Sequence, residues 1–416
     1  MDKRTDKIYI YADWAGMQKP KYMGILSSHP AQGAPVYSFE YSDEWLQSSE
    51  RFFFDPDINW YSGAQFPANK NNFGIIFDSM PDSWGKMLIR RFHSKKTGSA
   101  NKSRAQLQDV DYLLAVNDFL RSGGLRFKTD PEGPFVSGDS GFSVPPWAFV
   151  RELQASAKNV EEGRDESPEK NWLGMLIVPG SSLGGARPKA NIQDEEGNLW
   201  IAKFPSLNDI IDTGGWEQLI NKLAVKAGIT VPGSNAEIVS GKHHTYFTKR
   251  FDRLRERRIH FSSAMTVTGY TEEMIREKRP SYLEMAEFLR YHGAETIADL
   301  KQLWRRIAFN IAVSNTDDHL RNHGFLLEKK GWRLSPAYDL NPSIEKPGLA
   351  LNIDLYNNDL DFDLAMQTGE FYELSLPEMK SIIKEVLAAV KNWRKIAVRT
   401  GLPKVQIEIM SGAFKE

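Results

Sequence analysis

The residue types best suited to chemistry gather in one polar segment, residues 313–324, which holds two carboxylates, two imidazoles and two carboxamides. Within it, Asp317 precedes Asn322 by five positions. Protein kinases use this spacing, with an aspartate that orients the substrate hydroxyl and an asparagine that binds magnesium. The spacing therefore favours phosphoryl transfer, while a solvated polar loop between a helix and a strand is the alternative.

A further acidic position, Asp339, follows two short segments, residues 325–327 and 332–334, that predict a hairpin. A carboxylate at this place could bind the magnesium ion that bridges nucleotide phosphates, as the metal-binding aspartate of kinases does. Taken alone, residues 338–340 would fit a turn equally well.

A glycine- and serine-rich segment, residues 179–189, could bind those phosphates. Its small residues let bare backbone amides approach an anion, and Arg187 and Lys189 add positive charge. Such clusters more often form ordinary connections between strands, so the segment is weak evidence by itself.

A lone lysine, Lys203, lies on the second strand of the hairpin expected next, on a face that is otherwise apolar. An unpaired buried ammonium is costly, so a carboxylate partner is expected, and Glu217 in the following helix is the natural candidate. A kinase needs such a cation on the strand beside its glycine-rich loop. The alternative is a lysine whose stem packs while its head reaches water.

The elements that must position these residues follow one order. They are a hairpin (187–192 and 199–204), a helix (216–227), a second hairpin (236–239 and 245–248) and helices (283–291, 297–313 and one with a capping box at 375–378). The sequence of glycine-rich loop, strand lysine, helix glutamate, Asp–Asn loop, hairpin and aspartate is that of a kinase. One mechanism therefore explains four separate signals.

The first part of the chain is predicted to be rich in strands. Short alternating runs at residues 7–14, 24–26 and 36–41 indicate a small antiparallel sheet or barrel. An amphipathic helix capped by Asp78 or Ser79 should follow. Residues 121–147 are dense in glycine, proline and serine, which predicts a linker or a domain boundary.

Size and composition set the outer limits. At 416 residues the chain should form two or three lobes, and 41% hydrophobic with 26% charged residues is typical of a soluble globular protein. The 53 basic and 54 acidic residues give no sign of bulk electrostatic binding to nucleic acid or membrane. Since cysteine is absent, disulfides and thiolate-bound metals are excluded. No signal peptide or membrane span is apparent in the sequence, so a cytoplasmic protein is expected.

At these motifs the sequence also resembles a known family, the HipA-type serine/threonine kinases, which are toxins of bacterial toxin–antitoxin pairs. The resemblance is carried by residues 182–189, 201–205, 250–253, 315–322 and 336–340, and by residues 81–85, which resemble the family's N-terminal segment. It spans nearly the whole chain, and the combination is more specific than any single motif.

The resemblance implies roles for individual residues. Asp317 would be the catalytic aspartate, and Asn322 and Asp339 would hold magnesium. Lys203 would contact the α- and β-phosphates of ATP. The other nucleotide-binding residues would be Gly184, Gly185, Ala186, Arg187, Pro188, Lys189, Lys249, Arg250, Phe251, His319 and Tyr338.

Autophosphorylation is a further implication of the resemblance. Ser182 matches a serine that such kinases phosphorylate on themselves, which expels the loop and stops ATP binding. The neighbouring Ser181 offers a second hydroxyl. Asp318 adds a charge beside the catalytic aspartate where some relatives carry glycine, and the sequence assigns it no role.

The resemblance also implies partners. The protein substrate would be a translation component such as an aminoacyl-tRNA synthetase. The regulator would be a small HipB-like helix-turn-helix antitoxin, and DNA would be contacted only through the complex with it. No contact with a membrane is expected.

Other functions could use the same residues. A metal-dependent phosphohydrolase could use Asp317, Asp318, His319 and His323, whose histidines have the spacing of a helical zinc site, but this leaves Lys203 and the glycine-rich segment unexplained. A small-molecule kinase acting on a sugar or an antibiotic would need the same catalytic groups. A non-catalytic pseudokinase is disfavoured because the catalytic set is intact.

The combined prediction is an α+β, two-lobed kinase-like fold with a mixed α/β N-lobe and an all-α C-lobe. Its expected parts are a small β-rich subdomain over residues 1–130, an N-lobe with the glycine-rich loop over residues 131–250, and a helical C-lobe with the catalytic loop over residues 251–416.

Overall fold

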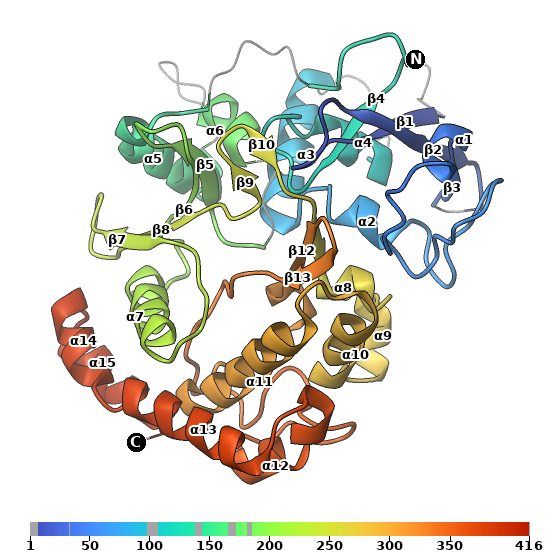
Figure 1. Ribbon diagram of the computed structural model, residues 1–416. Coiled ribbons are helices and arrows are strands. Elements are labelled where there is room, and N and C mark those ends of the chain that lie inside the picture. Colours follow the sequence, from blue (N-terminus) through green and yellow to red (C-terminus); the bar gives the residue numbers. More distant parts are fainter. Residues whose placement is uncertain are drawn as a thin grey trace. The chain divides into compact units, whose positions relative to one another are not determined.

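A computed structural model of the chain describes residues 7–32, 34–97, 107–137, 144–164, 172–180 and 185–415 (Figure 1). The chain divides into two compact units. The first comprises Met1–Asn208 and Asp252–Ser262, and the second comprises Asp209–Phe251 and Ser263–Glu416. The boundaries of the three expected parts, after residues 130 and 250, stay a prediction.

An antiparallel sheet with the order β3-β2-β1-β4 forms the N-terminal part of the first unit. Its strands are β1 (Lys7–Ala12), β2 (Lys21–His29), β3 (Val36–Tyr41) and β4 (Leu125–Lys128). The side chains of β1 alternate, with Ile8, Ile10 and Ala12 buried, as one packed face of a sheet requires. The predicted small antiparallel sheet is confirmed.

The linker predicted at residues 121–147 is wrong where β4 lies. This strand pairs with β1 along its whole length, from Tyr9 opposite Lys128 to Ala12 opposite Leu125. The glycines before β4 do not interrupt the fold, because the backbone of Gly124 packs closely against Asp13 and Trp14, and a Cβ there would lie only 3.0 Å from the carbonyl oxygen of Asp13.

Helices make up most of the rest of the first unit. They are α1 (Asp43–Leu46), α2 (Gly74–Phe77), α3 (Ser83–Thr97), α4 (Asp109–Ala115), α5 (Val150–Glu161) and α6 (Trp172–Gly180), with a 3-10 turn at Trp147–Phe149. The predicted cap at Asp78 or Ser79 is wrong, because α2 ends before these residues and α3 begins at Ser83. Helix α6 packs on α3 and α5.

Two hairpins complete the first unit. The predicted hairpin appears as β5 (Lys189–Gln193) and β6 (Leu199–Lys203), with Lys189 opposite Lys203. A short second hairpin consists of β9 (Arg253–Leu254) and β10 (Arg257–Arg258).

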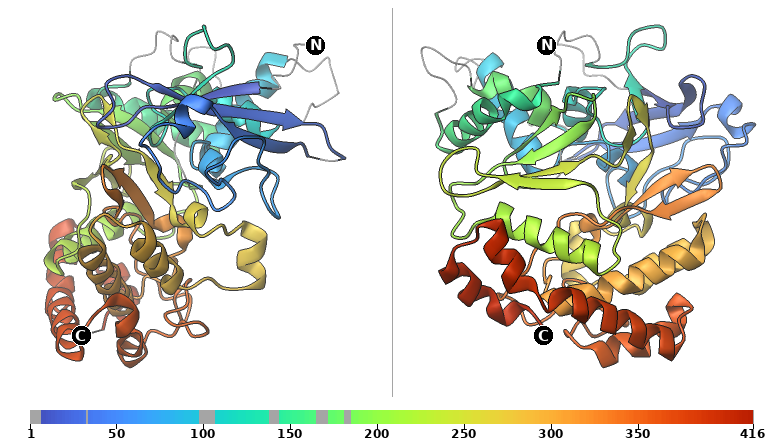
Figure 2. Two further views of the ribbon diagram at one scale, coloured as in Figure 1. Left: turned by 45° about the vertical axis from the view of Figure 1, so that its right-hand side comes forward. Right: turned by 60° about the vertical axis from the view of Figure 1, so that its left-hand side comes forward.

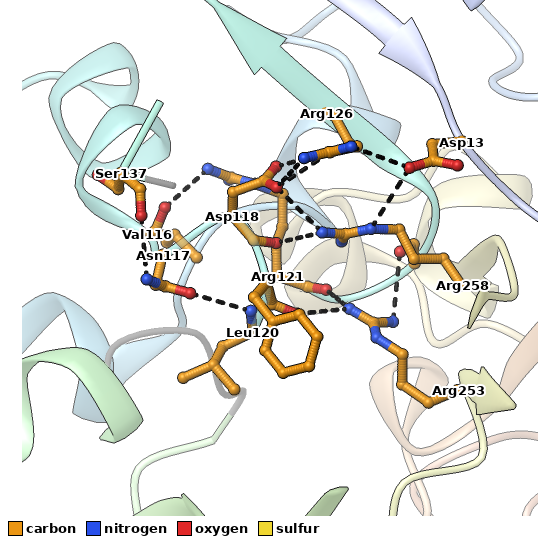
Figure 3. A network of polar contacts seen from close by, with 12 residues as sticks. Asp13, Val116, Asn117, Asp118, Leu120, Arg121, Arg126, Ser137, Arg253 and Arg258 are labelled. Carbon is orange, nitrogen blue, oxygen red and sulfur yellow. Dashed lines mark hydrogen bonds and ion pairs between the residues drawn. The ribbon is translucent and has the colours of Figure 1, made fainter. Parts of the chain in front are cut away.

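Buried ion pairs hold the β9–β10 segment within the first unit (Figure 3). Asp118 accepts from Arg126 at 2.6 Å and from Arg258 at 3.2 Å, and its carbonyl accepts from Arg258 at 2.7 Å. Arg253 pairs with Asp252 at 2.7 Å and donates to the carbonyl of Arg121. Since each guanidinium has several acceptors, the network can be buried without leaving an unpaired charge.

The second unit is mainly helical (Figure 2). Its helices are α7 (Thr213–Lys226), α8 (Ala264–Val267), α9 (Glu272–Glu277), α10 (Tyr282–His292), α11 (Thr296–Val313), α12 (Phe362–Gln367), α13 (Leu376–Val390), α14 (Trp393–Thr400) and α15 (Lys404–Ile409), with 3-10 turns at Leu320–Asn322, Gly369–Tyr372 and Met410–Ala413. Its hairpins are β7 (Ser234–Glu237) with β8 (Thr245–Lys249), and β12 (Gly324–Glu328) with β13 (Gly331–Leu334). The strand β11 (Phe261–Ser263) lies at the boundary of the two units.

The core of the second unit explains why α11 is fixed. From Leu303 to Val313 all its side chains are buried, and α10, α12 and α13 pack on it. Burying a large apolar side chain contributes about 1.5–3 kcal/mol, so such a helix is held rigidly. In the part of the chain that the structure describes, no helix is long and apolar enough to cross a membrane.

Candidate functional site

The polar loop starts at the C-terminus of the buried helix α11. The helix ends at Ser314, which has the left-handed φ of +49° and donates its backbone N–H to the carbonyl of Asn310. The side chain of Asn315 also donates to Asn310, at 3.1 Å. A rigid helix therefore fixes the first residues of the loop.

Asp318 anchors the loop from within. It is 1% exposed, and its Oδ2 accepts from the hydroxyl of Tyr282 at 2.5 Å, from the amide of Asn310 at 2.7 Å and from Nε2 of His323 at 2.7 Å. Burial, followed by the charge of Asp318, raises the pKa of Tyr282 well above its ordinary value, so this phenol stays a donor. A buried carboxylate is costly unless donors surround it, and here they do.

Asp317, the preceding residue, has the opposite environment. Its side chain is 68% exposed, and its carboxylate contacts Lys346 at 3.1 Å. The side-chain amide of Asn322 donates to the carbonyl of Asp317 at 3.1 Å, which leaves the amide oxygen of Asn322 as its candidate metal ligand. The loop thus presents Asp317 to solvent while its backbone is tied to a buried asparagine.

The segment of Asp339 lies against this loop. The hydroxyl of Tyr338 donates to the carbonyl of Arg321 at 2.8 Å, and the N–H of Ser343 donates to the carbonyl of Ser314 at 2.9 Å. Asp339 has a left-handed φ of +57°, which is uncommon for a residue with a side chain and is often found at functional sites. The structure therefore places the segment that contains Asp339 against the loop that carries Asp317 and Asn322, within the second unit.

The donor set suits magnesium better than zinc. Among the described residues, no group of three His, Cys, Asp or Glu side chains could hold a metal ion. Magnesium needs fewer protein ligands, since it keeps waters and binds substrate phosphates. A carboxylate at Asp339 and an amide oxygen at Asn322 fit that pattern.

The two histidines of the loop do not form a zinc pair. The helical spacing on which the phosphohydrolase alternative depends is absent, because α11 ends at Val313 and only the short 3-10 turn Leu320–Asn322 follows. His323 contacts Asp318 through Nε2, and Nδ1 of both His319 and His323 is buried with no hydrogen-bond partner among the described residues. An unsatisfied buried nitrogen beside Asp317 is suited to a ligand atom.

The predicted nucleotide-binding residues Lys249, Arg250 and Phe251 also lie in the second unit. Lys249 ends strand β8, and its backbone N–H donates to the carbonyl of Gly233 at 2.8 Å. The ring of Phe251 packs on the ring of Tyr338, with centroids 5.5 Å apart. Tyr338 of this pair directly precedes Asp339 in the sequence.

The first unit holds the other predicted nucleotide-binding residues. Lys203 lies at the end of β6, opposite the buried Lys189. Gly185, Ala186, Arg187 and Pro188 precede β5 in a bend. Ser181, Ser182 and Gly184 lie outside the described residues. Glu217, the expected partner of Lys203, is buried on α7 in the second unit.

The N-terminus of α3 holds the end of the glycine-rich segment. The N–H of Gly185 donates to Oδ2 of Asp82 at 3.0 Å, and its carbonyl accepts from the N–H of Trp84 at 3.1 Å. The indole of Trp84 donates to the carbonyl of Lys189 at 3.0 Å. Gly185 has a left-handed φ of +82°, which favours glycine here. These contacts link residues 101 to 105 positions apart, and sequence reasoning gave Asp82 and Trp84 no role toward the glycine-rich segment.

Curated proteins match only part of the chain. The Sinorhizobium fredii protein Y4mE, whose name marks it as an inferred kinase, is 28% identical over 158 residues, which is 36% of each chain. A Haemophilus influenzae protein, also named as an inferred kinase, is 27% identical over 180 residues, which is 38% of this chain and 52% of that protein. The chain thus spans about half or less of these relatives' length.

A solved structure matches nearly the whole fold. It is that of the Shewanella oneidensis toxin–antitoxin system HipA, in complex with HipB and its operator DNA, with a TM-score of 0.65 at 14% identity. The match covers 98% of this chain and 94% of that chain, so the predicted mixed α/β fold is confirmed as that of HipA.

The family model of the HipA-like C-terminal domain matches residues 181–393, which is more than half of the 416 residues. This range includes the polar loop, Asp339 and Lys203. The chain therefore belongs to the HipA-like C-terminal domain family.

Proposed function

We propose that this protein is a kinase that transfers the γ-phosphoryl group of ATP to a serine or threonine of a protein. The observation that carries the proposal is the contrast within the polar loop. Asp318 is buried and fixes the backbone, so that Asp317 is exposed beside Asn322 and the Asp339 segment. This combination of an exposed carboxylate with candidate metal ligands suits phosphoryl transfer, in which positioning and electrostatics dominate.

Magnesium and ATP are the implied cofactors. Asn322 and Asp339 would hold the metal ion, which would neutralise negative charge on the phosphates. The aromatic pair of Phe251 and Tyr338 offers an apolar surface for the adenine ring. Lys203 and the backbone of residues 184–189 are the candidates for the phosphate contacts.

Asp317 would act on the acceptor. Its carboxylate accepts a hydrogen bond from the acceptor hydroxyl, which orients the oxygen toward the γ-phosphorus, and takes the proton as the new bond forms. The three donors on Asp318 keep the loop in place during this step.

Family membership supports a finer proposal. The solved relative is a toxin bound to HipB and operator DNA. A HipB-like helix-turn-helix antitoxin is the proposed partner, through which the protein would reach DNA, and a translation component such as an aminoacyl-tRNA synthetase is the proposed substrate. The proposed sites of autophosphorylation are Ser182 and Ser181.

The direct test is phosphoryl transfer by the purified protein. With Mg-ATP, the wild type should release ADP and gain phosphate on Ser182 or Ser181, which intact and peptide mass spectrometry detects. Asp317→Asn should lower the rate by about 10²–10⁴-fold, as expected for loss of a general base. Asp363→Asn, which changes another exposed aspartate of the second unit, is the control. A wild type that neither releases ADP nor gains phosphate would refute the proposal.

A further inference from the structure

The exposed carboxylate of Asp317 has one polar partner in the part of the chain that the structure describes. Nζ of Lys346 lies 3.1 Å from its Oδ1, and the two side chains are 56% and 68% exposed. Both residues belong to the second unit. A substrate hydroxyl that reaches Asp317 would therefore meet the ammonium of Lys346 as well.

The loop that carries Lys346 is fixed at both ends. Before it, Ser343 donates its N–H to the carbonyl of Ser314, at the start of the polar loop. After it, Leu349 donates its N–H to the carbonyl of Asn358 at 2.9 Å, and Gly348 bridges to Asp359. The short chain between these anchors places Lys346 next to Asp317.

The stability of the fold does not explain the ion pair of Lys346 and Asp317. An exposed ion pair contributes only about 0–1 kcal/mol, because solvent screens it and two long side chains lose freedom. A cation beside the group that takes the acceptor proton has a chemical use, since the transferred phosphoryl group carries negative charge on its equatorial oxygens.

We propose that Lys346 is a further catalytic residue of the phosphoryl transfer, which rests on the function proposed above. Its ammonium orients Asp317 and donates hydrogen bonds to the oxygens of the phosphoryl group in transit. The acceptor oxygen forms a bond to the γ-phosphorus while the bond to the β,γ-bridging oxygen breaks, and ADP keeps that electron pair. The hydroxyl proton passes to Asp317, and Lys346 keeps its own protons throughout.

The role proposed for Lys346 differs from the one proposed for Lys203. Lys203, by the family resemblance, would contact the α- and β-phosphates, which do not move. Lys346 would act at the reacting phosphoryl group, on the side of Asp317. Its loss should therefore lower kcat and leave the affinity for ATP nearly unchanged.

The test compares the full-length wild type with Lys346→Met, Lys346→Arg and Asp317→Asn. The readouts are ADP release and self-incorporated phosphate with Mg-ATP as the only substrate, together with Mg-ATP binding by calorimetry. Lys346→Met should lower kcat by about 10–10³-fold while the Kd for Mg-ATP changes less than about threefold. Lys346→Arg keeps the charge and should recover part of the rate. Thermal melting should show that all variants remain folded.

A matched control comes from the same unit. Lys301 pairs with Glu378 at 3.4 Å, with side chains 42% and 46% exposed, so Lys301→Met removes a comparable surface pair away from Asp317. It should keep wild-type kcat. Lys346→Met with unchanged or higher kcat, beside an inactive Asp317→Asn, would overturn this inference alone. A wild type without activity would remove the proposed function and this inference with it.

Discussion

Two adjacent aspartates of the polar loop have opposite surroundings. The Asp317 side chain is 68% exposed, whereas that of Asp318 is 1% exposed. The buried carboxylate is tolerated because three donors hold it, and the exposed one stays open to a substrate. The structure thus gives Asp318 the task of holding the loop.

Replacing Asp318 by asparagine should destabilise the second unit. The substitution removes the charge and turns one of two acceptor atoms into a donor, in a place where Tyr282, Asn310 and His323 all donate. We expect a loss of about 2–4 kcal/mol in the free energy of unfolding. Denaturant unfolding followed by tryptophan fluorescence measures it.

A milder variant provides the control for Asp318→Asn. Tyr282→Phe removes one of the three donors and leaves the charge, so it should cost about 1–2 kcal/mol. Wild-type stability for Asp318→Asn would show that its carboxylate does not anchor the loop.

At this scale the sequence names the residues whose signal is local. Asp317 and Asn322 could be named as candidates because their spacing has a chemical meaning within six residues of chain. Lys346 and Tyr282 could not, because they stand 29 and 36 positions from their partners. No periodicity or spacing rule connects such residues before the chain is folded.

Among the elements, those with strong local patterns were predicted well. The helix expected at residues 297–313 is α11, and the capping box of Ser375 and Glu378 starts α13. Both hairpins expected between residues 187 and 248 are present, with ends shifted by at most two residues. Amphipathic periodicity and capping act within a few residues, so they can be read without the fold.

The elements that depend on distant partners were missed. The strand β4 pairs with β1, whose residues are more than one hundred positions earlier. The start of α3 was also misplaced. Asp82, just before the helix, accepts from the N–H groups of both Ser83 and the distant Gly185, and the N–H of Trp84 donates to the carbonyl of Gly185. Local composition cannot reveal either arrangement.

The link between α3 and the glycine-rich segment leads to a prediction about ATP binding. Asp82→Asn weakens the acceptor that holds the N–H of Gly185 at 3.0 Å, so the end of the loop becomes less ordered. One such bond to a charged acceptor contributes about 1.5–3 kcal/mol at most, and we expect the KM for ATP to rise about 3–10-fold with a smaller change in kcat. Steady-state ADP release measures both constants.

Asp43 offers a control for this variant. Asp43 is exposed and lies at the start of another helix, α1. Asp43→Asn should leave the KM unchanged. If Asp82→Asn had the same KM as the wild type, the contact between Asp82 and Gly185 would not be what orders the loop for ATP binding.

At the scale of the whole molecule, the chain passes from the first unit to the second, returns to the first for a short segment, and then completes the second. The chain leaves the second unit after Phe251 and returns to it at Ser263. The contacts that retain the segment between them join residues from 129 to 243 positions apart. A HipA of only 14% identity shares the fold, so most residues of the chain can differ without changing it.

The ion pairs of Asp118 with Arg126 and Arg258 should determine whether residues 252–262 stay in place in the first unit. Burial lowers the pKa of Arg121 to about 9, and the charge of Asp118 opposes this effect. Without Asp118, Arg126 and Arg258 would lose the carboxylate that they share, and the guanidinium of Arg258 is buried. We therefore expect Asp118→Ala to cost the first unit about 3–5 kcal/mol, since an uncompensated buried charge remains.

Hydrogen exchange followed by mass spectrometry can localise this effect. In Asp118→Ala, peptides that contain β4 and residues 253–258 should lose protection, while peptides of α11 keep it, because α11 has no part in the network. Asp13→Ala is the matched control, since the Asp13 side chain is 29% exposed and pairs with the same Arg126, so its loss should cost at most about 1 kcal/mol. If both variants exchanged alike, the buried carboxylate of Asp118 would not be what retains the segment. Protection lost equally in α11 would instead mean that the two units unfold together.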